Sequence, residues 1–475
     1  MLLHTDFFMN GEFFMNKEQT LKKMSEMPVG KLILRTGIPM IVSMVLQAVY
    51  NIADSAFVSN MSLNGEDALN ALTLAFPIQI LIIAAGIGTG VGVNALVSRC
   101  LGQGDIQKAS KAAGNAIFLA AVITILAMIF GASGIKPYIS SRTKNPIIYD
   151  MAVKYLRICC LISFGNIFFA IFEKLLQSTG LSVYSSIAQI VGALINIILD
   201  PIMIYGLFGC PEMGVSGAAY ATIAGQIVSF AVALILHLKF NTAVKITLKS
   251  LVPSIGIIKS IYRIGLPAII AQALMSFMTY GLNIILGSIN ENMVTAYGLY
   301  YKMQQFLLFA AFGMRDALTP IIAFNYGRYS KKRVTDSLKH GIIYTSIIMI
   351  VGIAVLEIFA ARFAQIFGLS GTTEDLYISA TQIISVSLIF AGINISLQGA
   401  FQGLNAGKET LLISIMRQLI FVLPFAFLFS VIAKNNSNYM WTVWTTFIIS
   451  ESLSCIFAAA FMKKIYKNKV QKLND

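Results

Sequence analysis

The stretch 32-LILRTGIPMIVSMVLQAVYNIADSAFVSN-60 begins as an apolar run and ends among polar side chains. A helix needs about 20 apolar residues to cross the hydrocarbon core of a bilayer. Runs of this kind recur along nearly all of the 475 residues, of which 57% are hydrophobic and 12% charged. Because the runs are continuous and do not alternate with a period of two, they predict helices and not a membrane barrel. We therefore expect an all-α polytopic membrane protein.

Twelve transmembrane helices account for the apolar runs. We expect them at residues 32–59, 68–97, 109–133, 150–178, 183–207, 213–238, 257–288, 292–325, 337–361, 375–404, 409–432 and 440–462. Residues 1–31 mix acidic and basic side chains without an apolar centre. They predict a short amphipathic or disordered lead-in and not a cleavable signal peptide.

Lysine and arginine gather on one side of this arrangement. The connections on that side hold 24 of the 35 basic residues, and those on the other side hold five. Cytoplasmic loops retain positive charge, so we expect a multi-pass protein of the inner or plasma membrane with both termini in the cytoplasm. The net charge of +14 then reflects this bias and the attraction to anionic lipids, and it gives no reason to expect a nucleic acid partner.

Six basic residues fall within the expected spans: Lys154, Arg157, Lys174, Lys302, Arg315 and Arg417. We expect all but Lys302 and Arg315 to lie near helix ends and to snorkel to the membrane surface. Lys302 and Arg315, together with Glu173, are candidates for a substrate cavity. A structural ion pair is an equally good reading for Glu173 beside Lys174, whereas Arg315 and Asp316 are adjacent in sequence and are not expected to face each other.

The two halves of the chain repeat. The segment 32-LILRTGIPM-40 matches 260-SIYRIGLPA-268, and further along a constant offset of 225 pairs Gly88 with Gly313 and Gly102 with Gly327. A repeat of six spans enters the membrane twice in the same direction, as in many secondary transporters. We therefore expect two six-helix pseudo-symmetric lobes around a central cavity. The expected parts are a cytoplasmic segment 1–31, an N-lobe 32–238, a cytoplasmic linker 239–256, a C-lobe 257–462 and a cytoplasmic tail 463–475.

Polar side chains gather in the first and fifth spans. Gln47 and Asp54 are seven residues apart and share a helix face, and Asn51 lies within one turn of both. In the fifth span, Asn196 and Asp200 are four apart and again share a face. Counted from the cytoplasmic helix ends at about 1.5 Å per residue, the two aspartates reach comparable depth, so the four residues can form one site.

Such a site suits a coupling ion. Removal from water favours the protonated form of a carboxyl group, and a second carboxylate nearby favours it further, so H⁺ can bind near neutral pH. Oxygen ligands suit Na⁺ equally well. The plainer reading is a hydrated helix end at Asp54 and a locally capped kink at Asp200-Pro201. The repeat favours a functional role, because Asp54 aligns with Leu282, or with Asn283 one residue further on, and Asp200 aligns with Phe425. Neither carboxylate therefore belongs to the duplicated scaffold.

The motifs "GIPM…YNIADSAFVSN", "SRCLGQGD", "NIILDP" and "GVSGAAYATIAGQ" resemble those of the MATE (multidrug and toxic compound extrusion) family, over residues 30–465. The resemblance implies a two-lobed antiporter that exports cationic or amphiphilic drugs in exchange for H⁺ or Na⁺, with no other cofactor. It also implies a cation site at Asp54, Gln47, Asn196 and Asp200, which is the only metal site that we expect. The family's fourth-helix asparagine has Ala170 at its gapless match, and Asn166 lies one turn earlier.

Other functions fit less well. A flippase for lipid-linked sugars, from the same superfamily, commonly has extra helices and a strongly basic cavity, and neither is clear here. An integral-membrane enzyme needs clusters of His, Asp or Glu in sizeable loops, whereas these loops are short, so we expect no enzyme and no catalytic residues.

The five cysteines show no metal-ligand spacing. We expect a monomer with small-molecule substrates and membrane lipid as its partners.

Overall fold

The computed structural model describes residues 17–61 and 65–473, which fold almost entirely into helices. A short α2 (Lys17–Glu26) precedes the first long helix. The first half contains α3 (Val29–Ser59), α4 (Gly65–Gly102), α5 (Ile106–Ser133), α6 (Ile135–Ser140), α7 (Pro146–Leu161), α8 (Phe164–Ser178), α9 (Ser182–Tyr205), η1 (Leu207–Gly209) and α10 (Val215–Phe240).

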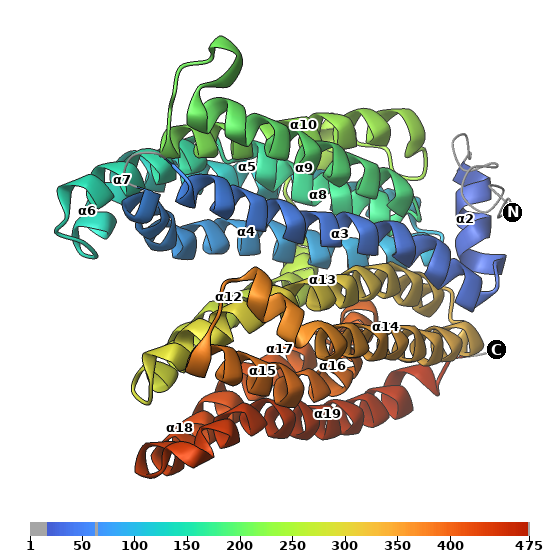
Figure 1. Ribbon diagram of the computed structural model, residues 1–475. Helices are drawn as coiled ribbons and strands as arrows, with labels where there is room; N and C mark the ends of the chain where they lie inside the picture. The colour runs from blue at the N-terminus through green and yellow to red at the C-terminus, as the bar shows by residue number, and fades with distance from the viewer. Residues whose placement is uncertain (1–16, 62–64, 474–475) are drawn as a thin grey trace, which may run out of the picture.

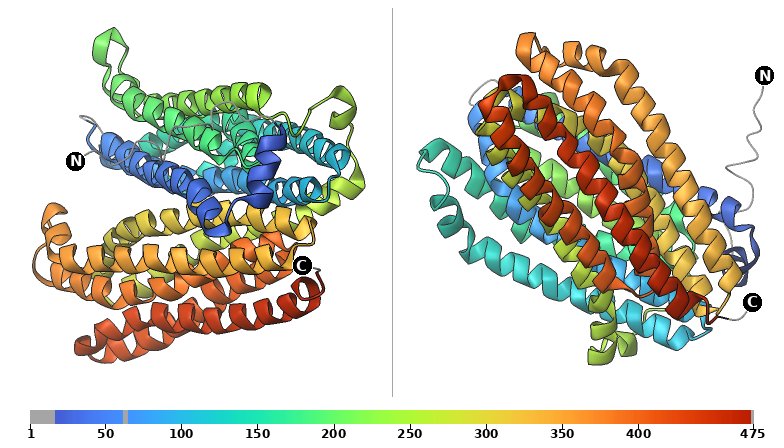
Figure 2. Two further views of the ribbon diagram at one scale, coloured as in Figure 1. Left: turned by 90° about the vertical axis from the view of Figure 1, so that its right-hand side faces the viewer. Right: turned by 90° about the horizontal axis from the view of Figure 1, so that it is seen from below.

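The second half repeats this order after the short α11 (Leu248–Leu251). It contains α12 (Ile255–Gly287), α13 (Glu291–Gly327), α14 (Lys331–Ile366), α15 (Gly371–Val386), α16 (Leu388–Gly403), α17 (Gly407–Ile415), the π-helical η2 (Met416–Phe421), α18 (Val422–Asn435), η3 (Ser437–Trp444), α19 (Thr445–Ile465) and the π-helical η4 (Tyr466–Val470). Figure 1 shows the two halves as two stacked bundles, α3 to α10 above and α12 to α19 below, and the left view of Figure 2 shows the same separation from a further side.

The number of spans agrees with the sequence. Within the described residues, ten helices are long and apolar enough to cross a membrane, and two bent pairs bring the total to twelve. The bent pairs are α7 with α8, at 46°, and α15 with α16, at 47°. They occupy equivalent places in the two halves, since α7 and α15 begin 225 residues apart. The all-α, twelve-helix prediction is confirmed.

Helix ends follow local sequence. The side chain of Asn145 accepts hydrogen bonds from the backbone N–H groups of Ile147 and Ile148, and Pro146 occupies the first turn of α7, where a missing N–H costs nothing. Gly206 ends α9 in the left-handed conformation with φ of 73°, which glycine adopts without strain. α9 is continuous through Pro201, so the proline does not break the helix as a transporter's interrupted helix would.

The expected linker and the expected tail both contain helix. The linker contains α11, and Asn115 of α5 holds it through hydrogen bonds to the carbonyl groups of Ser250 and Val252, both at 3.2 Å. The last helix continues to Val470, beyond the expected start of the tail at residue 463. Residues 1–16 and 474–475 lie outside the described residues, and so does most of the predicted lead-in.

The lobes pack together through glycines at one end. A Cβ atom on Gly102 would lie 2.0 Å from the carbonyl oxygen of Phe324, and one on Gly327 would lie 2.3 Å from that of Arg99. Since both glycines and both contacted residues are 225 positions apart, the two contacts are related by the repeat. Only glycine permits such close approach of two backbones. The pseudo-symmetry expected from the sequence is thus present in the contact between the halves.

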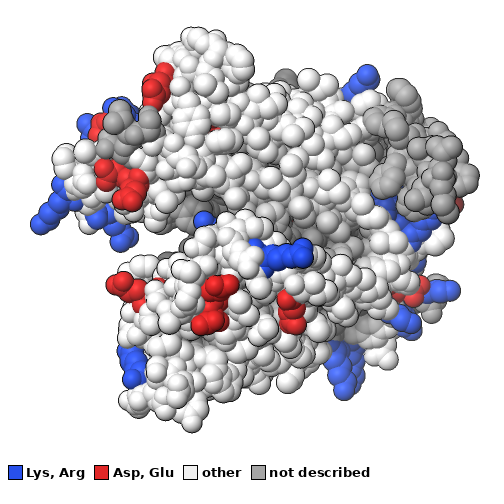
Figure 3. Space-filling view, in the orientation of Figure 1, with Lys and Arg blue, Asp and Glu red and all other residues white. Residues whose placement is uncertain are grey.

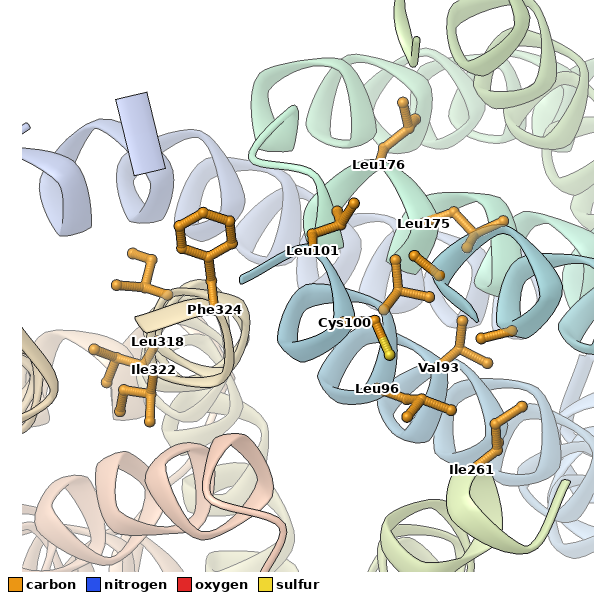
Figure 4. Packing of buried hydrophobic residues seen from close by; sticks show 14 of the residues in the cluster. Val93, Leu96, Cys100, Leu101, Leu175, Leu176, Ile261, Leu318, Ile322 and Phe324 are labelled. Atoms are coloured by element: carbon orange, nitrogen blue, oxygen red, sulfur yellow. The ribbon is translucent and has the colours of Figure 1, made fainter. Parts of the chain in front are cut away.

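Apolar side chains complete this contact. Figure 4 shows Leu96, Cys100 and Leu101 of α4 facing the neighbouring helices, with Phe324 of α13 and Ile261 of α12 close by. These residues belong to one buried cluster that draws on both halves. At the opposite end the halves diverge, and Figure 3 shows the surface hollowed between them. The molecule is therefore closed at the end that carries α2 and the C-terminal end of the chain, and open at the other.

Candidate functional site

Polar contacts join α3 to α9 along their length. The Oγ atoms of Ser43 and Ser186 lie 3.5 Å apart, and Gln189 Nε2 donates to Gln47 Oε1 at 2.6 Å. Further along, the hydroxyl group of Tyr205 donates to the carbonyl of Phe57 at 2.7 Å. In a membrane, polar side chains buried between two helices satisfy their hydrogen bonds by bonding across the helix contact. The two helices that carry the expected site residues are therefore neighbours in register.

The two aspartates lie within this register. Asp200 is fully buried and Asn196 is 3% exposed, and Asn196 Nδ2 lies 3.4 Å from Asp200 Oδ1. Asp54 is close enough for its charge to act on that of Asp200. The structure thus brings together Gln47, Asp54, Asn196 and Asp200 on one α3–α9 interface, although 146 residues separate the two carboxyl groups. We call these four residues the N-lobe cluster.

Three oxygen atoms of this cluster are buried without a hydrogen-bond donor among the described residues: Asp54 Oδ1, Asn196 Oδ1 and Asp200 Oδ2. Each is an acceptor, and a buried acceptor without a donor is costly. A proton on a carboxyl group or a cation between the oxygens would supply what they lack. Carboxylate and amide oxygens are ligands for hard cations, so the residues fit either H⁺ or Na⁺.

Two further residues belong to this neighbourhood. Gln189 holds Gln47, and Tyr50 interacts with Gln47 and with both aspartates. The signal for Gln189 was present in the sequence, because it precedes Asn196 by seven residues, the same spacing as Gln47 and Asp54. Tyr50 precedes Asp54 by four residues and therefore shares its face, but an aromatic residue within an apolar span does not stand out.

Asn51 and Asn166 differ from the four clustered residues. Asn51 is exposed, unlike Gln47 and Asp54 on either side of it, and Asn166 of α8 is half-buried. No hydrogen bond of the described residues links either side chain to an aspartate. Asn51 thus lies within one turn of Gln47 and Asp54, as the sequence predicts, but its side chain is more exposed than theirs.

A second group of buried charges joins the two lobes. Lys174 Nζ of α8 lies 2.6 Å from Asp316 Oδ2 of α13, and Arg315 contacts the other oxygen of Asp316 at 2.8 Å. Lys174 also lies 3.5 Å from Glu173 and donates to Gln177 at 3.0 Å. These five residues form the interlobe ion network, and Lys174 and Asp316 are 1% and 3% exposed in it.

The network corrects two expectations. Lys174 does not snorkel: its stem lies against Gly90 of α4, where an added Cβ would meet Lys174 Cγ at 2.8 Å, and its ammonium group points into the lobe contact. Arg315 does face its neighbour Asp316, because the long arginine side chain folds back onto the adjacent carboxylate. Of the expected substrate-cavity residues, Glu173 is thus part of the ion network, and Lys302 is exposed on α13.

A third buried ion pair lies within the C-lobe. Arg417 of η2 contacts Glu451 of α19, and Asn394 Nδ2 donates to Glu451 at 2.9 Å. The arginine side chain is 12% exposed, so the expectation that Arg417 snorkels is wrong as well. Arg315 and Arg417 line a common pocket together with glutamine side chains. By contrast, Lys154 and Arg157 are exposed, as snorkelling residues are.

The comparisons with known proteins agree with this architecture. The MatE family model matches residues 39–202 and 267–428, once in each lobe. Multidrug export protein MepA of Staphylococcus aureus (strain MSSA476) is 25% identical over 463 residues, which cover 96% of this chain and 98% of that protein. A multidrug resistance MATE family transporter of the MOP superfamily, solved in an outward-facing conformation, is 26% identical, with a TM-score of 0.86 over 96% of this chain and all of that one.

A further solved structure is similar to the same extent. It is a MOP superfamily transporter from Pyrococcus furiosus, described as having a binding pocket of reverse polarity that suggests a different function. Its identity is 26% and its TM-score 0.83, over 96% of this chain and 99% of that one. Because the family model covers more than half of the chain, with one match in each lobe, the chain belongs to the MatE family and is a transporter rather than an enzyme.

Proposed function

We propose that the protein is a multidrug efflux antiporter that exports cationic or amphiphilic small molecules in exchange for H⁺ or Na⁺. Export of several drugs is supported by the relatives, which include a multidrug export protein and a multidrug resistance transporter, and the cationic or amphiphilic class is what the family resemblance implies. The orientation follows from the bias of lysine and arginine: both termini lie in the cytoplasm of the plasma membrane, and the closed end of the molecule faces inward. A monomer is part of this proposal.

Alternating access supplies the transport step. The lobes meet at the end that carries Gly102 and Gly327 and diverge at the other, which corresponds to an outward-facing state. Reversal of this arrangement, by rocking of one lobe against the other, would expose the cavity to the cytoplasm. The interlobe ion network must separate in that movement, since Lys174 and Asp316 belong to different lobes.

The observation that carries the coupling is the set of unpartnered oxygens in the N-lobe cluster. Ion pairs within the described residues include Lys174, Arg315 and Arg417, but none of them includes Asp54 or Asp200. Two buried carboxyl groups without a cationic partner favour binding of a mobile cation. A cation that binds from outside and leaves inside can drive the movement of another solute outward.

The test is efflux of a fluorescent cation, ethidium, from proteoliposomes with a proton gradient and a sodium gradient imposed separately. We expect one of the two gradients to accelerate efflux and its ionophore to abolish the effect. If neither gradient changes the rate while ethidium still crosses through the protein, the antiport proposal is wrong.

The alternative is a flippase for lipid-linked sugars. A structure with this fold and a different suggested function is known among the similar proteins, so the fold does not decide the substrate. The same proteoliposomes separate the two functions. A protein that translocates a lipid-linked precursor and never ethidium is the flippase, whereas efflux of ethidium under a gradient without lipid translocation identifies the exporter.

A further inference from the structure

The short helix α2 (Lys17–Glu26) precedes both lobes, in a region where the sequence predicts only an amphipathic or disordered lead-in. Figure 1 shows it crosswise to the long helices, at the end where the lobes meet. Two residues, Met27 and Pro28, separate it from α3, so it is attached covalently to the N-lobe. Its contacts with the two lobes indicate what it does at this end.

One face of α2 rests on the turn between α8 and α9 of the N-lobe. Thr20 and Met24 are four residues apart and hence on one helix face, and they are 3% and 1% exposed. A Cβ atom on Gly180, which has a φ of 82°, would lie 3.1 Å from Met24 Cγ and 3.7 Å from Thr20 Cγ2. Met24 also belongs to the buried cluster that draws on both lobes. The helix is therefore docked on the protein by apolar burial.

The C-terminal end of α2 is held by the C-lobe. Arg333, in the first turn of α14, donates from Nη2 to the carbonyl groups of Met24 and Met27, at 3.1 Å and 3.0 Å. The last carbonyl groups of a helix have no partner within it and carry partial negative charge, so a cation there satisfies and stabilises them. Arg333 Nε also donates to Asn325 Oδ1 at 2.8 Å. Because Asn325 is fully buried, it fixes the position of the guanidinium group.

These two docking contacts lie on different lobes. The turn at Gly180 belongs to the N-lobe, and Arg333 belongs to the C-lobe. A helix of ten residues is about 15 Å long and does not stretch, so both contacts cannot persist when the lobes part at this end. Since α2 is tied to α3 by a short connection, the contact that must be given up is the one with Arg333.

We propose that α2 is a strap across the closed end, docked on both lobes while that end is closed and released from Arg333 when it opens. The docked strap favours the outward-facing state, because its contact with the C-lobe exists only in the closed arrangement. It is a latch distinct from the N-lobe cluster and from the interlobe ion network. Docking does not depend on the coupling ion, whereas the link between release and transport rests on the proposed alternating access.

The test is hydrogen–deuterium exchange of backbone amides, measured by mass spectrometry on the full-length protein in detergent without a gradient. Arg333→Gln removes the cap on α2, and Met24→Gln places an amide group in the apolar contact with Gly180. The loss of a hydrogen bond from a charged donor, or the burial of an amide without a partner, corresponds to about tenfold or more in an equilibrium. Exchange follows the population of the open form. We therefore expect both variants to exchange about tenfold faster in α2 and in the lobe contact at residues 97–104 and 322–330.

Two matched variants serve as controls. Lys332→Gln removes the same charge from the exposed residue beside Arg333, and Lys22→Gln places the same amide on the exposed face of α2. Both should exchange like the wild-type protein. Arg333→Lys keeps a cation at the end of α2 and should retain part of the protection. Residues 134–145, at the opposite end of the N-lobe, should keep the wild-type rate in every variant, which separates opening of the closed end from general unfolding.

Wild-type exchange of α2 in both test variants overturns the docking contacts. Faster exchange of α2 with an unchanged lobe contact overturns the strap, and so does faster exchange along the whole chain, which shows general destabilisation. The proposed antiport is judged separately. The expected exchange pattern in a protein whose ethidium efflux ignores both gradients refutes the antiport alone, and gradient-driven efflux without the exchange pattern refutes the strap alone.

Discussion

The N-lobe cluster and the interlobe ion network each bury two carboxyl groups, but only the network contains cations. In the network, Lys174 and Arg315 accompany Glu173 and Asp316. In the cluster, Asp54 and Asp200 have amide and hydroxyl neighbours, and no Lys or Arg of the described residues forms an ion pair with either.

The presence or absence of a cationic partner suits these buried carboxyl groups to different roles. A buried carboxylate that carries its own counter-cation is satisfied, and it holds together the elements that contribute the two charges. A buried carboxylate without one needs a cation from solution. The network is therefore suited to join the lobes at the closed end, and the cluster is suited to bind and release an ion. Substitutions at the cluster, at the network, at the glycine contacts and at Asn51 test this contrast.

We expect the largest loss of transport from substitutions in the N-lobe cluster. Asp200→Asn and Asp54→Asn remove a charge that the coupling ion must neutralise, so gradient-driven ethidium efflux should fall to the rate of protein-free liposomes. Thermal stability should not decrease, because the substitution removes an unpartnered buried carboxyl group. The matched control is Asp150→Asn on the exposed surface of α7, which should transport like the wild-type protein. Wild-type efflux by Asp54→Asn would show that the carboxyl group of Asp54 has no part in coupling.

Substitution in the interlobe ion network should lower the stability of the folded protein. Asp316→Asn leaves Lys174 and Arg315 buried beside each other without their shared partner, and breaking a buried ion pair costs about 3–5 kcal/mol. Asp150 forms a pair with Lys154 at the same distance, 2.6 Å, but both of those side chains are 60% exposed. Loss of an exposed pair costs at most about 1 kcal/mol.

Thermal unfolding of the two variants in detergent compares these costs at equal distance and unequal burial. Equal shifts in the midpoint for Asp316→Asn and Asp150→Asn would show that burial does not set the strength of these pairs. The paired variant Lys174→Met/Asp316→Leu should recover part of the lost stability, because it leaves no stranded charge.

Substitution of the glycines at the lobe contact should destabilise the protein less than Asp316→Asn does. In Gly102→Ala the new Cβ would meet the carbonyl oxygen of Phe324, and such overpacking typically costs about 1–3 kcal/mol. We expect the closed end to loosen and Cys100, which is 1% exposed, to react faster with a thiol reagent, as measured by mass spectrometry. Gly327→Ala should act in the same way, because its contact is the symmetric one.

Gly256→Ala is the control for both, since an added Cβ there has no atom within 4 Å. If the three variants label Cys100 at the same rate, the glycines do not determine the closure of the lobes.

The smallest effect is expected at Asn51. Its side chain is exposed, and Asn51→Ala should change stability by no more than about 0.5 kcal/mol and leave efflux unchanged. Gln47→Ala removes the acceptor for Gln189 and should cost about 1 kcal/mol, with slower efflux. Efflux assays of the two variants show which of the two residues contributes more to transport. A larger loss for Asn51→Ala would place the ion on the exposed side of α3.

Much of this architecture follows from the sequence. The length of the apolar runs and the constant offset of 225 predict twelve helices in two lobes, because a helix in lipid must satisfy its own backbone and a duplicated unit of six spans keeps its direction. The spacings of Gln47 with Asp54 and of Asn196 with Asp200 likewise predict shared faces, since helical periodicity is a local property.

Contacts between distant helices required the tertiary structure. Lys174 and Asp316 lie 142 positions apart, and whether a lysine near a helix end reaches the membrane surface or a partner depends on which helix packs beside it. Only the packing of α9 against α3 separates the half-buried Gln47 from the exposed Asn51. The pocket between Arg315 and Arg417 combines residues of five helices and a π-helical turn. Sequence determined which residues can share a helix face, because that depends on local geometry; tertiary structure decided which charges are paired, because a partner comes from elsewhere in the fold.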